Sequence, residues 1–259
     1  MNLTFYKYQG TGNDFVMIDN RNLSFPKDDA KLINRLCDRR FGVGADGLIL
    51  LEPSKDCDFK MIYFNADGNE GSMCGNGGRC LVAFANQLNI IESETTFDAI
   101  DGLHYATIED GIVSLKMIDI DTIENYENHS FLNTGSPHHI CFSNDVKNID
   151  VNKEGAKIRF GSPYFNEGTN VNFVEQLNKN SFKVRTYERG VENETLACGT
   201  GVTAVALAAH NLRKTDTTTV KIDVLGGHLE VSFTEDNGSY NNIFLKGPAK
   251  FVFKGVISI

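Results

Sequence analysis

The sequence is poor in basic residues and has no long apolar run. It contains 25 lysines and arginines against 34 aspartates and glutamates, and the resulting net charge of −9 argues against a general nucleic-acid binder. An acidic chain can still bind an anionic substrate, because one arginine and a few backbone N–H groups bind a carboxylate locally. No apolar run approaches the ~20 residues that a membrane helix needs, so we expect no membrane association.

A secretory leader is also missing from the printed sequence. The first seven residues lack a basic stretch followed by an apolar core, so we expect a cytoplasmic protein whose six cysteines are reduced. The cysteines form no C-x-x-C pair, and no two histidines have the i, i+4 spacing of a helical zinc site. We therefore expect no metal, and we expect Cys37, Cys57 and Cys141 to be ordinary small apolar residues.

The chain contains an internal repeat. Short blocks recur in the same order at an offset of 124 residues. The matched pairs are Phe41 with Phe165, Tyr63 with Tyr187, Asn69-Glu70 with Asn193-Glu194, and Cys74-Gly75 with Cys198-Gly199. Such a run of matches predicts two homologous halves. If a pseudo-two-fold axis relates them, Cys74 faces Cys198.

Short apolar runs between glycine-containing and polar turns indicate a chain rich in β-strands. Strands are expected at 3–8, 14–19, 48–51 and 59–64, and again between 220 and 259, and a helix is expected from Asp28 or Asp29 to about Asp38. Two segments, 80–85 and 202–209, are apolar on most or all sides, which predicts buried helices. Each follows a cysteine and a predicted glycine-rich turn.

These elements predict an α+β fold of two pseudo-symmetric lobes. Each lobe is expected to be a curved, mostly antiparallel sheet wrapped around a buried helix, with the active site in the cleft between the lobes. The N-terminal lobe is expected to comprise residues 1–120, completed by the C-terminal strand 252–259. The C-terminal lobe would comprise residues 121–251.

The chemistry is expected at the two cysteine–glycine turns. A thiol at a helix start lies among exposed backbone N–H groups and the positive end of the helix dipole, which favour the thiolate. Two thiols on opposite walls of a cleft suit stereoinversion at a carbon next to a carboxylate. One thiol removes the proton from one face and the other returns a proton to the opposite face, while the helix starts stabilise the developing charge.

The motifs resemble those of diaminopimelate epimerase over nearly the whole chain. The matching segments are Gly12-Asn13-Asp14-Phe15-Val16, Gly42-Val43-Gly44-Ala45-Asp46, Asn65-Ala66-Asp67-Gly68-Asn69-Glu70, Cys74-Gly75-Asn76-Gly77-Gly78-Arg79-Cys80, Tyr187-Glu188-Arg189-Gly190 and Ala197-Cys198-Gly199-Thr200-Gly201. The resemblance implies a cofactor-independent, two-cysteine isomerase and homodimer that interconverts LL- and meso-2,6-diaminoheptanedioate, a step toward lysine and the cell wall.

The resemblance also implies residue roles. Cys74 and Cys198 would exchange the proton, with His138 shaping the site and Glu188 facing an ammonium group. The backbone of Gly75, Asn76, Gly199 and Thr200 would hold the reacting carboxylate. The polar ends of the substrate would be contacted by Asn13, Asn65, Asn170 and Arg189.

Two positions depart from the family pattern. Ser136 stands before Pro-His where the family often has Asn, and Gly47 stands where some members carry Gln. Both positions can contact substrate, so these two residues affect the prediction of local substrate contacts and leave the predicted reaction class unchanged. The alternatives are a proline racemase-like enzyme, a thiol redox protein and a non-catalytic amino-acid binding module.

Overall fold

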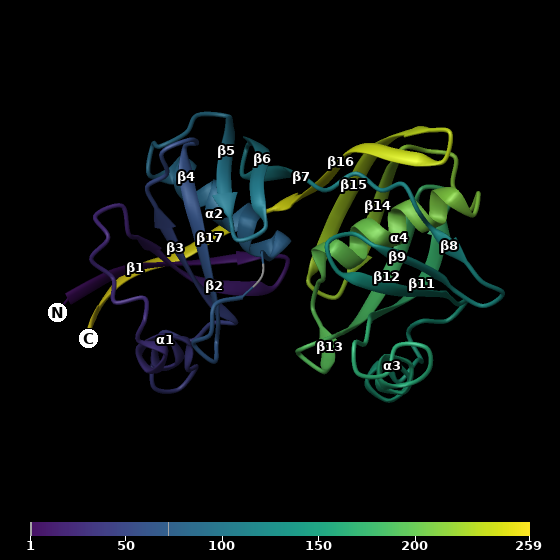
Figure 1. Cartoon of the computed structure of the whole chain (residues 1–259), viewed down its shortest axis with the longest axis horizontal. Coiled ribbons are helices and arrows are strands. Elements are labelled where there is room, and N and C mark those ends of the chain that lie inside the picture. Colours follow the sequence, from purple (N-terminus) through teal and green to yellow (C-terminus); the bar gives the residue numbers. More distant parts are fainter. Residues whose placement is uncertain (1, 72) are drawn as a thin grey trace. The chain divides into compact units, whose positions relative to one another are not determined.

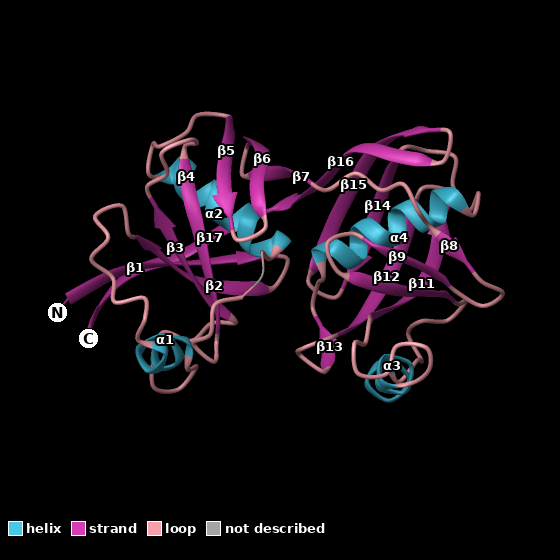
Figure 2. Ribbon diagram, in the orientation of Figure 1, coloured by secondary structure: helices cyan, strands magenta, loops and turns pink. Residues whose placement is uncertain are grey.

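The computed structural model describes residues 2–71 and 73–259. It divides into two compact units, each with its own core (Figures 1 and 2). Residues up to Leu115 together with Gly247–Ile259 form the first unit, and Lys116–Lys246 form the second. Within the described ranges, no helix is long and apolar enough to cross a membrane.

The first unit packs a twisted sheet around one long helix. Its elements are β1 (Asn2–Gly10), β2 (Asn13–Asp19), α1 (Ala30–Cys37), β3 (Gly47–Glu52), β4 (Phe59–Asn65), α2 (Gly75–Gln87), β5 (Glu94–Ala99), β6 (Gly102–Glu109), β7 (Ile112–Lys116) and β17 (Lys250–Ser258). The strands pair in the order β17-β1-β2-β3-β4-β5-β6-β7. The pairs β2–β3 and β4–β5 are parallel, and the other pairs are antiparallel.

The second unit is built in the same way. Its elements are β8 (Glu124–Asn125), β9 (Ser130–Asn133), β10 (Pro137–Phe142), α3 (Val151–Phe160), β11 (Asn170–Asn178), β12 (Ser181–Glu188), β13 (Asn193–Thr195), α4 (Gly199–Asn211), β14 (Thr219–Val224), β15 (Gly227–Asp236) and β16 (Ser239–Pro248). The strands pair in the order β8-β9-β10-β11-β12-β14-β15-β16, and β13 pairs with β12. Here β10–β11 and β12–β14 are the parallel pairs.

The two units repeat one topology. In the first, α1 lies in the connection of the parallel pair β2–β3, and α2 lies in that of β4–β5; α3 and α4 take these places in the second. Helices α2 and α4 each have 13 residues, and their first residues are Gly75 and Gly199. The internal repeat predicted from the sequence is therefore confirmed in the order and direction of the strands.

The central helices are buried because they carry small and apolar residues on all sides. In α4, every residue from Gly201 to Ala209 is buried, and Val202 and Leu207 pack with strand residues such as Phe182 in one core cluster. Figure 2 shows α4 lying across the strands of its unit. In α2, Leu81 and Phe84 are fully buried. These burials confirm the predicted helices.

The glycines after each cysteine do not form the predicted turn, because they already belong to the first turn of the helix. Their lack of a side chain lets neighbouring strands approach. A Cβ on Gly77 would lie 2.9 Å from Ile49 Cδ1, and one on Gly201 would lie 2.5 Å from Asn172 Oδ1. Close packing, rather than a turn, explains glycine at these positions.

Strand β17 joins the C-terminal end of the chain to the first unit. It pairs antiparallel with β1 from Asn2 opposite Ser258 to Gln9 opposite Lys250. Figure 1 shows the two chain ends next to each other at one edge of this unit. The first unit is therefore completed by residues from the far end of the sequence.

Candidate active site

Cys74 and Cys198 occupy the same structural position in the two units. Each is the N-cap residue of a central helix, α2 or α4, with an extended backbone (φ −112° and ψ 119° for Cys74; φ −120° and ψ 111° for Cys198). Cys198 is buried and Cys74 is half-buried. Each thiol therefore lies beside the N–H groups and the positive dipole end of a 13-residue helix.

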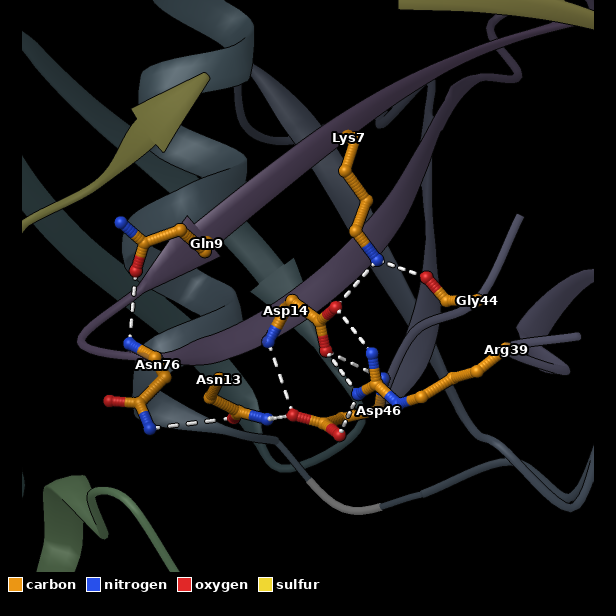
Figure 3. A network of polar contacts seen from close by, with 9 residues as sticks. Lys7, Gln9, Asn13, Asp14, Arg39, Gly44, Asp46 and Asn76 are labelled. Atoms are coloured by element: carbon orange, nitrogen blue, oxygen red, sulfur yellow. Dashed lines mark hydrogen bonds and ion pairs between the residues drawn. The ribbon is translucent and has the colours of Figure 1, made fainter. Parts of the chain in front are cut away.

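Asn13 lies beside the sulfur of Cys74 and is contacted by Asn76; Figure 3 shows the two asparagines. Cys74 Sγ lies 3.6 Å from Asn13 Oδ1, and Asn76 Nδ2 donates to the same oxygen at 3.4 Å. Asn13 Nδ2 donates to Asp46 Oδ2 at 2.6 Å. Because a carboxylate only accepts, Asp46 fixes the Asn13 amide with its oxygen toward the sulfur.

A network of alternating charges holds Asp46 in place (Figure 3). Arg39 pairs with both Asp46 and Asp14 at 2.7 Å, and Lys7 pairs with Asp14 at 2.7 Å and also donates to the carbonyl of Gly44. Burial would raise the pKa of Asp14, but hydrogen bonds from Arg39 and Lys7 and their charges outweigh it and hold the pKa well below its usual range. The network carries two positive and two negative charges, so it orients Asn13 without adding net charge.

Arg79 is a fully buried cation one turn into α2. Its Nη2 donates to Thr11 Oγ1 at 2.9 Å and to Asn76 Oδ1 at 3.0 Å. Its Nε has no hydrogen-bond partner among the described residues. Because a guanidinium only donates, Arg79 fixes the Asn76 amide with its nitrogen toward Asn13.

Thr200 adjoins the sulfur of Cys198, and His138 adjoins Thr200. Thr200 Oγ1 lies 3.5 Å from Cys198 Sγ and 2.9 Å from His138 Nε2. The other ring nitrogen, Nδ1, lies 3.1 Å from Asn172 Nδ2. Burial, with a smaller contribution from the charge of Arg189, lowers the pKa of His138 to about 3, so the imidazole is neutral at physiological pH.

Asn170 connects β10, β11 and the end of β12. Its Nδ2 donates to the carbonyl of Pro137 at 3.0 Å, and its Oδ1 accepts from the backbone N–H of Arg189 at 2.9 Å. Arg189 itself is exposed, and its Nη1 donates to the carbonyl of Glu167 at 2.9 Å. Asn170 therefore positions the backbone that carries Arg189. Glu188 is half-buried at the end of β12.

Asn65 lies at the exposed end of β4, opposite Gly47 in the register of β3. Its backbone closes a turn with Asn69. A Cβ on Gly71 would lie 3.0 Å from Asn65 Nδ2, so glycine at that position leaves room for the amide. The predicted residues of the first unit thus gather at the starts of β2 and α2, with Asn65 at the end of β4.

Sequence reasoning missed Asn172, Arg79 and Asp46 as site residues. Asn172 shares a strand face with Asn170 two residues earlier, and two asparagines on one face of a buried strand were the available signal. Arg79 was visible as a lone charge in an apolar helix. In the part of the chain that the structure describes, no group of three His, Cys, Asp or Glu residues is arranged to hold a metal ion.

The fold of two repeated units is shared with a class of proteins of known structure. The phenazine biosynthesis protein of the PhzF family from Bacillus anthracis has a TM-score of 0.79 at 14% identity, covering 100% of both chains. A probable proline racemase from Agrobacterium radiobacter has a TM-score of 0.67 at 16% identity, covering 99% of this chain and 92% of that one. These similarities establish the α+β fold with two lobes.

Sequence comparison narrows the class to one family. The family model described as diaminopimelate epimerase matches residues 5–113 and 130–252. A diaminopimelate epimerase from Flavobacterium psychrophilum is 59% identical over 98% of this chain and 100% of its own. One from Chlorobaculum tepidum is 42% identical over 96% of this chain and 99% of its own. The chain belongs to the diaminopimelate epimerase family, as its motifs indicated.

The roles of individual residues stay predictions. The structure brings Asn13, Asn76 and Cys74 together in the first unit, and His138, Thr200 and Cys198 together in the second. That the two sulfurs face each other, and that Glu188 and Arg189 contact a substrate, stay predictions too.

Proposed function

We propose that this protein interconverts LL- and meso-2,6-diaminoheptanedioate by two-base proton transfer, without a cofactor. One sulfur takes the proton from the α carbon as the Cα–H bond breaks, and the other sulfur gives its proton to the opposite face. Membership of the diaminopimelate epimerase family supports the substrate. The paired Cys-Gly helix starts support the chemistry.

The reacting carboxylate would be bound by backbone N–H groups at both helix starts, those of Gly75 and Asn76 in α2 and of Gly199 and Thr200 in α4. Negative charge that spreads from the carbanion onto the carboxylate oxygens would be stabilised by these donors and by both helix dipoles. Stabilising the carbanion in this way needs no metal, since the backbone N–H donors are already in place before the reaction begins.

The distal end of the substrate carries a second carboxylate and a second ammonium group. The exposed guanidinium of Arg189 would bind the carboxylate, and Glu188 would face an ammonium. Asn13, Asn65 and Asn170 would contribute neutral polar contacts. Since both polar ends of the Asn170 amide already have protein partners, its part in binding would run chiefly through the position of Arg189.

The observation that carries the proposal is the pair of cysteines at equivalent helix N-caps of two repeated units. The test is incubation with LL-diaminopimelate in deuterated water, followed by chiral analysis and mass measurement. We expect the meso isomer, with one solvent deuterium at the inverted carbon. Unchanged stereochemistry would indicate a non-catalytic binding module. Inversion of proline in a parallel incubation, without inversion of diaminopimelate, would identify a proline racemase-like enzyme.

We further propose a cytoplasmic homodimer in which the exposed apolar side chains of β17 meet those of a second copy. Phe251, Val252, Phe253 and Val256 are 45%, 52%, 44% and 64% exposed, an unusual density of apolar side chains for one strand. Val252→Lys should shift the protein from dimer to monomer in light scattering coupled to size exclusion, whereas Thr234→Lys on the exposed part of β15 should not. A monomeric parent protein would refute this assembly.

A further inference from the structure

Arg79 places a positive charge in the interior of the first unit. Its side chain is fully buried, and its guanidinium reaches back over the first turn of α2. Nη1 donates to the carbonyl of Gly75 at 3.4 Å, and Nη2 donates to Asn76 Oδ1 at 3.0 Å and to Thr11 Oγ1 at 2.9 Å. The charge therefore lies beside the two residues with which α2 begins.

Among the described residues, no aspartate or glutamate is a partner of Arg79. Its three acceptors are neutral oxygens, and within residues 2–71 and 73–259 its Nε has no hydrogen-bond partner. The ionisable groups that act on it are Cys80 and Cys74. Burial raises the pKa of Cys80 to about 12, although the charge of Arg79 opposes this, so Cys80 is a neutral thiol at physiological pH. Buried cations are ordinarily paired with an anion, because an unpaired one destabilises the fold.

The second unit shows that the fold does not require a charge at this position. At the offset of the internal repeat, Thr203 in α4 corresponds to Arg79 in α2. Thr203 is also fully buried, and its hydroxyl donates to the carbonyl of Gly199 at 3.0 Å, as Arg79 Nη1 donates to that of Gly75. A neutral side chain thus provides the equivalent hydrogen bond. What Arg79 adds is the positive charge.

We infer that Arg79 supplies the positive charge that attracts the reacting carboxylate of the substrate to the start of α2. The proposed donors to this carboxylate are the backbone N–H groups of Gly75 and Asn76, and the guanidinium contacts both residues. The inference rests on the proposed function, which places the carboxylate there. Because Arg79 has no exposed surface, the attraction acts through the protein interior, where charges are screened less than in water.

The same charge stabilises the transition state more than the bound substrate. As the α proton leaves, negative charge spreads from the carbon onto the carboxylate oxygens, so the attraction to a fixed cation grows. The guanidinium is buried and held by three hydrogen bonds, so it is in place before the reaction begins. A neutral residue at position 79 should therefore lower both the affinity for the substrate and kcat.

The binding test separates charge from hydrogen bonding at position 79. Titration calorimetry measures the Kd of LL-diaminopimelate in Cys74→Ala, which lacks the thiol and should not turn the substrate over. Arg79→Gln in this background keeps an amide donor and loses the charge, and it should raise Kd about tenfold. Arg79→Lys keeps the charge with fewer donors and should stay within about threefold of Cys74→Ala alone.

Turnover is measured in proteins that keep Cys74. Arg79→Gln should lower kcat about tenfold and raise KM, and Arg79→Lys should restore most of both. Thr203→Val is the matched control, because it removes the equivalent hydrogen bond in α4 and no charge, and it should keep the parental Kd. Equal losses in Arg79→Gln and Arg79→Lys, or an unchanged Kd in Arg79→Gln, would overturn the inference.

A measurement without substitution at position 79 covers the case in which these variants fold poorly. Nitrogen-15 NMR of Cys74→Ala follows the Nε–H group of Arg79 during the titration with LL-diaminopimelate. Its resonance should shift as the carboxylate binds, and an unshifted resonance at saturation would overturn the inference. The deuterium experiment tests the proposed function separately. Inversion of the substrate together with an unaffected Arg79→Gln would reject only the role of Arg79.

Discussion

The asparagines around the two cysteines are oriented by groups that can only donate or only accept. Arg79 fixes Asn76, Asp46 fixes Asn13, and the carbonyl of His139 fixes Asn172. Each amide then presents a known atom toward a sulfur or toward its neighbour. An amide without such an anchor could rotate, and the electrostatic environment of the thiol would change with it.

Replacement of Cys74 by alanine should lower the rate of deuterium incorporation by at least about 10³-fold, because the site loses one of its two proton carriers. The residue precedes α2 and is only half-buried, so the circular dichroism spectrum should not change. Cys57→Ala is the matched control and should keep parental turnover. The Cys57 thiol is also half-buried, but its contacts are with Ser54 and the carbonyl of Phe59 and not with the predicted site residues. A Cys74→Ala protein with parental turnover would remove this residue from the mechanism.

His139 predicts a loss of stability on the acid side. Burial, with a smaller effect from His129, lowers its pKa to about 4, below the ~6.5 of an unfolded chain. The unfolded state therefore binds the proton first, and stability that is present above pH 6.5 is lost as the pH falls toward 4. Acidification from pH 7 to pH 5 should therefore lower the free energy of unfolding by about 2 kcal/mol through this group.

Urea unfolding of the parent and of His139→Phe at these two pH values measures that cost. The variant should lose less stability on acidification than the parent, by up to about 2 kcal/mol. Equal losses in the two proteins would mean that His139 is not held neutral by the fold.

At the scale of the elements, the first turns of α2 and α4 depend on glycine to different degrees. Gly77 and Gly201 occupy equivalent positions. A Cβ on Gly77 would meet the end of the Ile49 side chain at 2.9 Å, whereas one on Gly201 would meet Asn172 Oδ1 at 2.5 Å and His138 Cε1 at 3.2 Å. Ile49 Cδ1 can rotate away, but Asn172 is buried and held by several hydrogen bonds.

Gly201→Ala should therefore lower the free energy of unfolding by about 1–3 kcal/mol and also impair turnover. Gly77→Ala should stay within about 1 kcal/mol of the parent, since alanine is the better helix former and offsets mild crowding. The measurement is denaturant unfolding, with deuterium incorporation as the activity assay. Equal effects of the two substitutions would show that Asn172 is free to move.

Elements with a strong local signal were predictable from the sequence. The helix expected from Asp28 or Asp29 begins after Asp29, whose Oδ1 accepts from the backbone N–H of Leu32 at 3.0 Å. The apolar central helices and the first four strands were found as well. Helix α3 was not predicted, because only Val151 and Gly155 are buried in it and its apolar pattern is weak. The glycines of α2 and α4 misled local reasoning, because the reason for them lies in strands distant in sequence.

Only those residues of the candidate site that belong to recognisable sequence motifs could be predicted. The sequence supplied both cysteines, His138 and the residues at the two helix starts. It did not supply Asn172 as the partner of His138, because that contact depends on the parallel register that sets His138 opposite Asn170. Register across a parallel pair is a property of the folded sheet, and no local pattern encodes it.

At the scale of the whole molecule, the first unit depends on both ends of the chain. Removal of Lys250–Ile259 would strip β1 of one of its two antiparallel partners and uncover Leu3 and Phe5, which are 6% exposed in the fold. Hydrogen exchange should then accelerate in β1, while β11 in the second unit keeps its protection. Removal of Ser258 and Ile259 alone is the control and should leave β1 protected. Unaltered exchange in β1 after the longer deletion would contradict the role of β17.

The pairing of β1 with β17 also sets an order in time. During synthesis, the second unit is encoded by one uninterrupted stretch, Lys116–Lys246, so all of its residues have been joined before those of β17 are added. The first unit has to hold β1 without its outer neighbour until β17 has been made. The first unit would thus be the one completed last, and the open edge of β1 would meanwhile be exposed to chaperones and proteases.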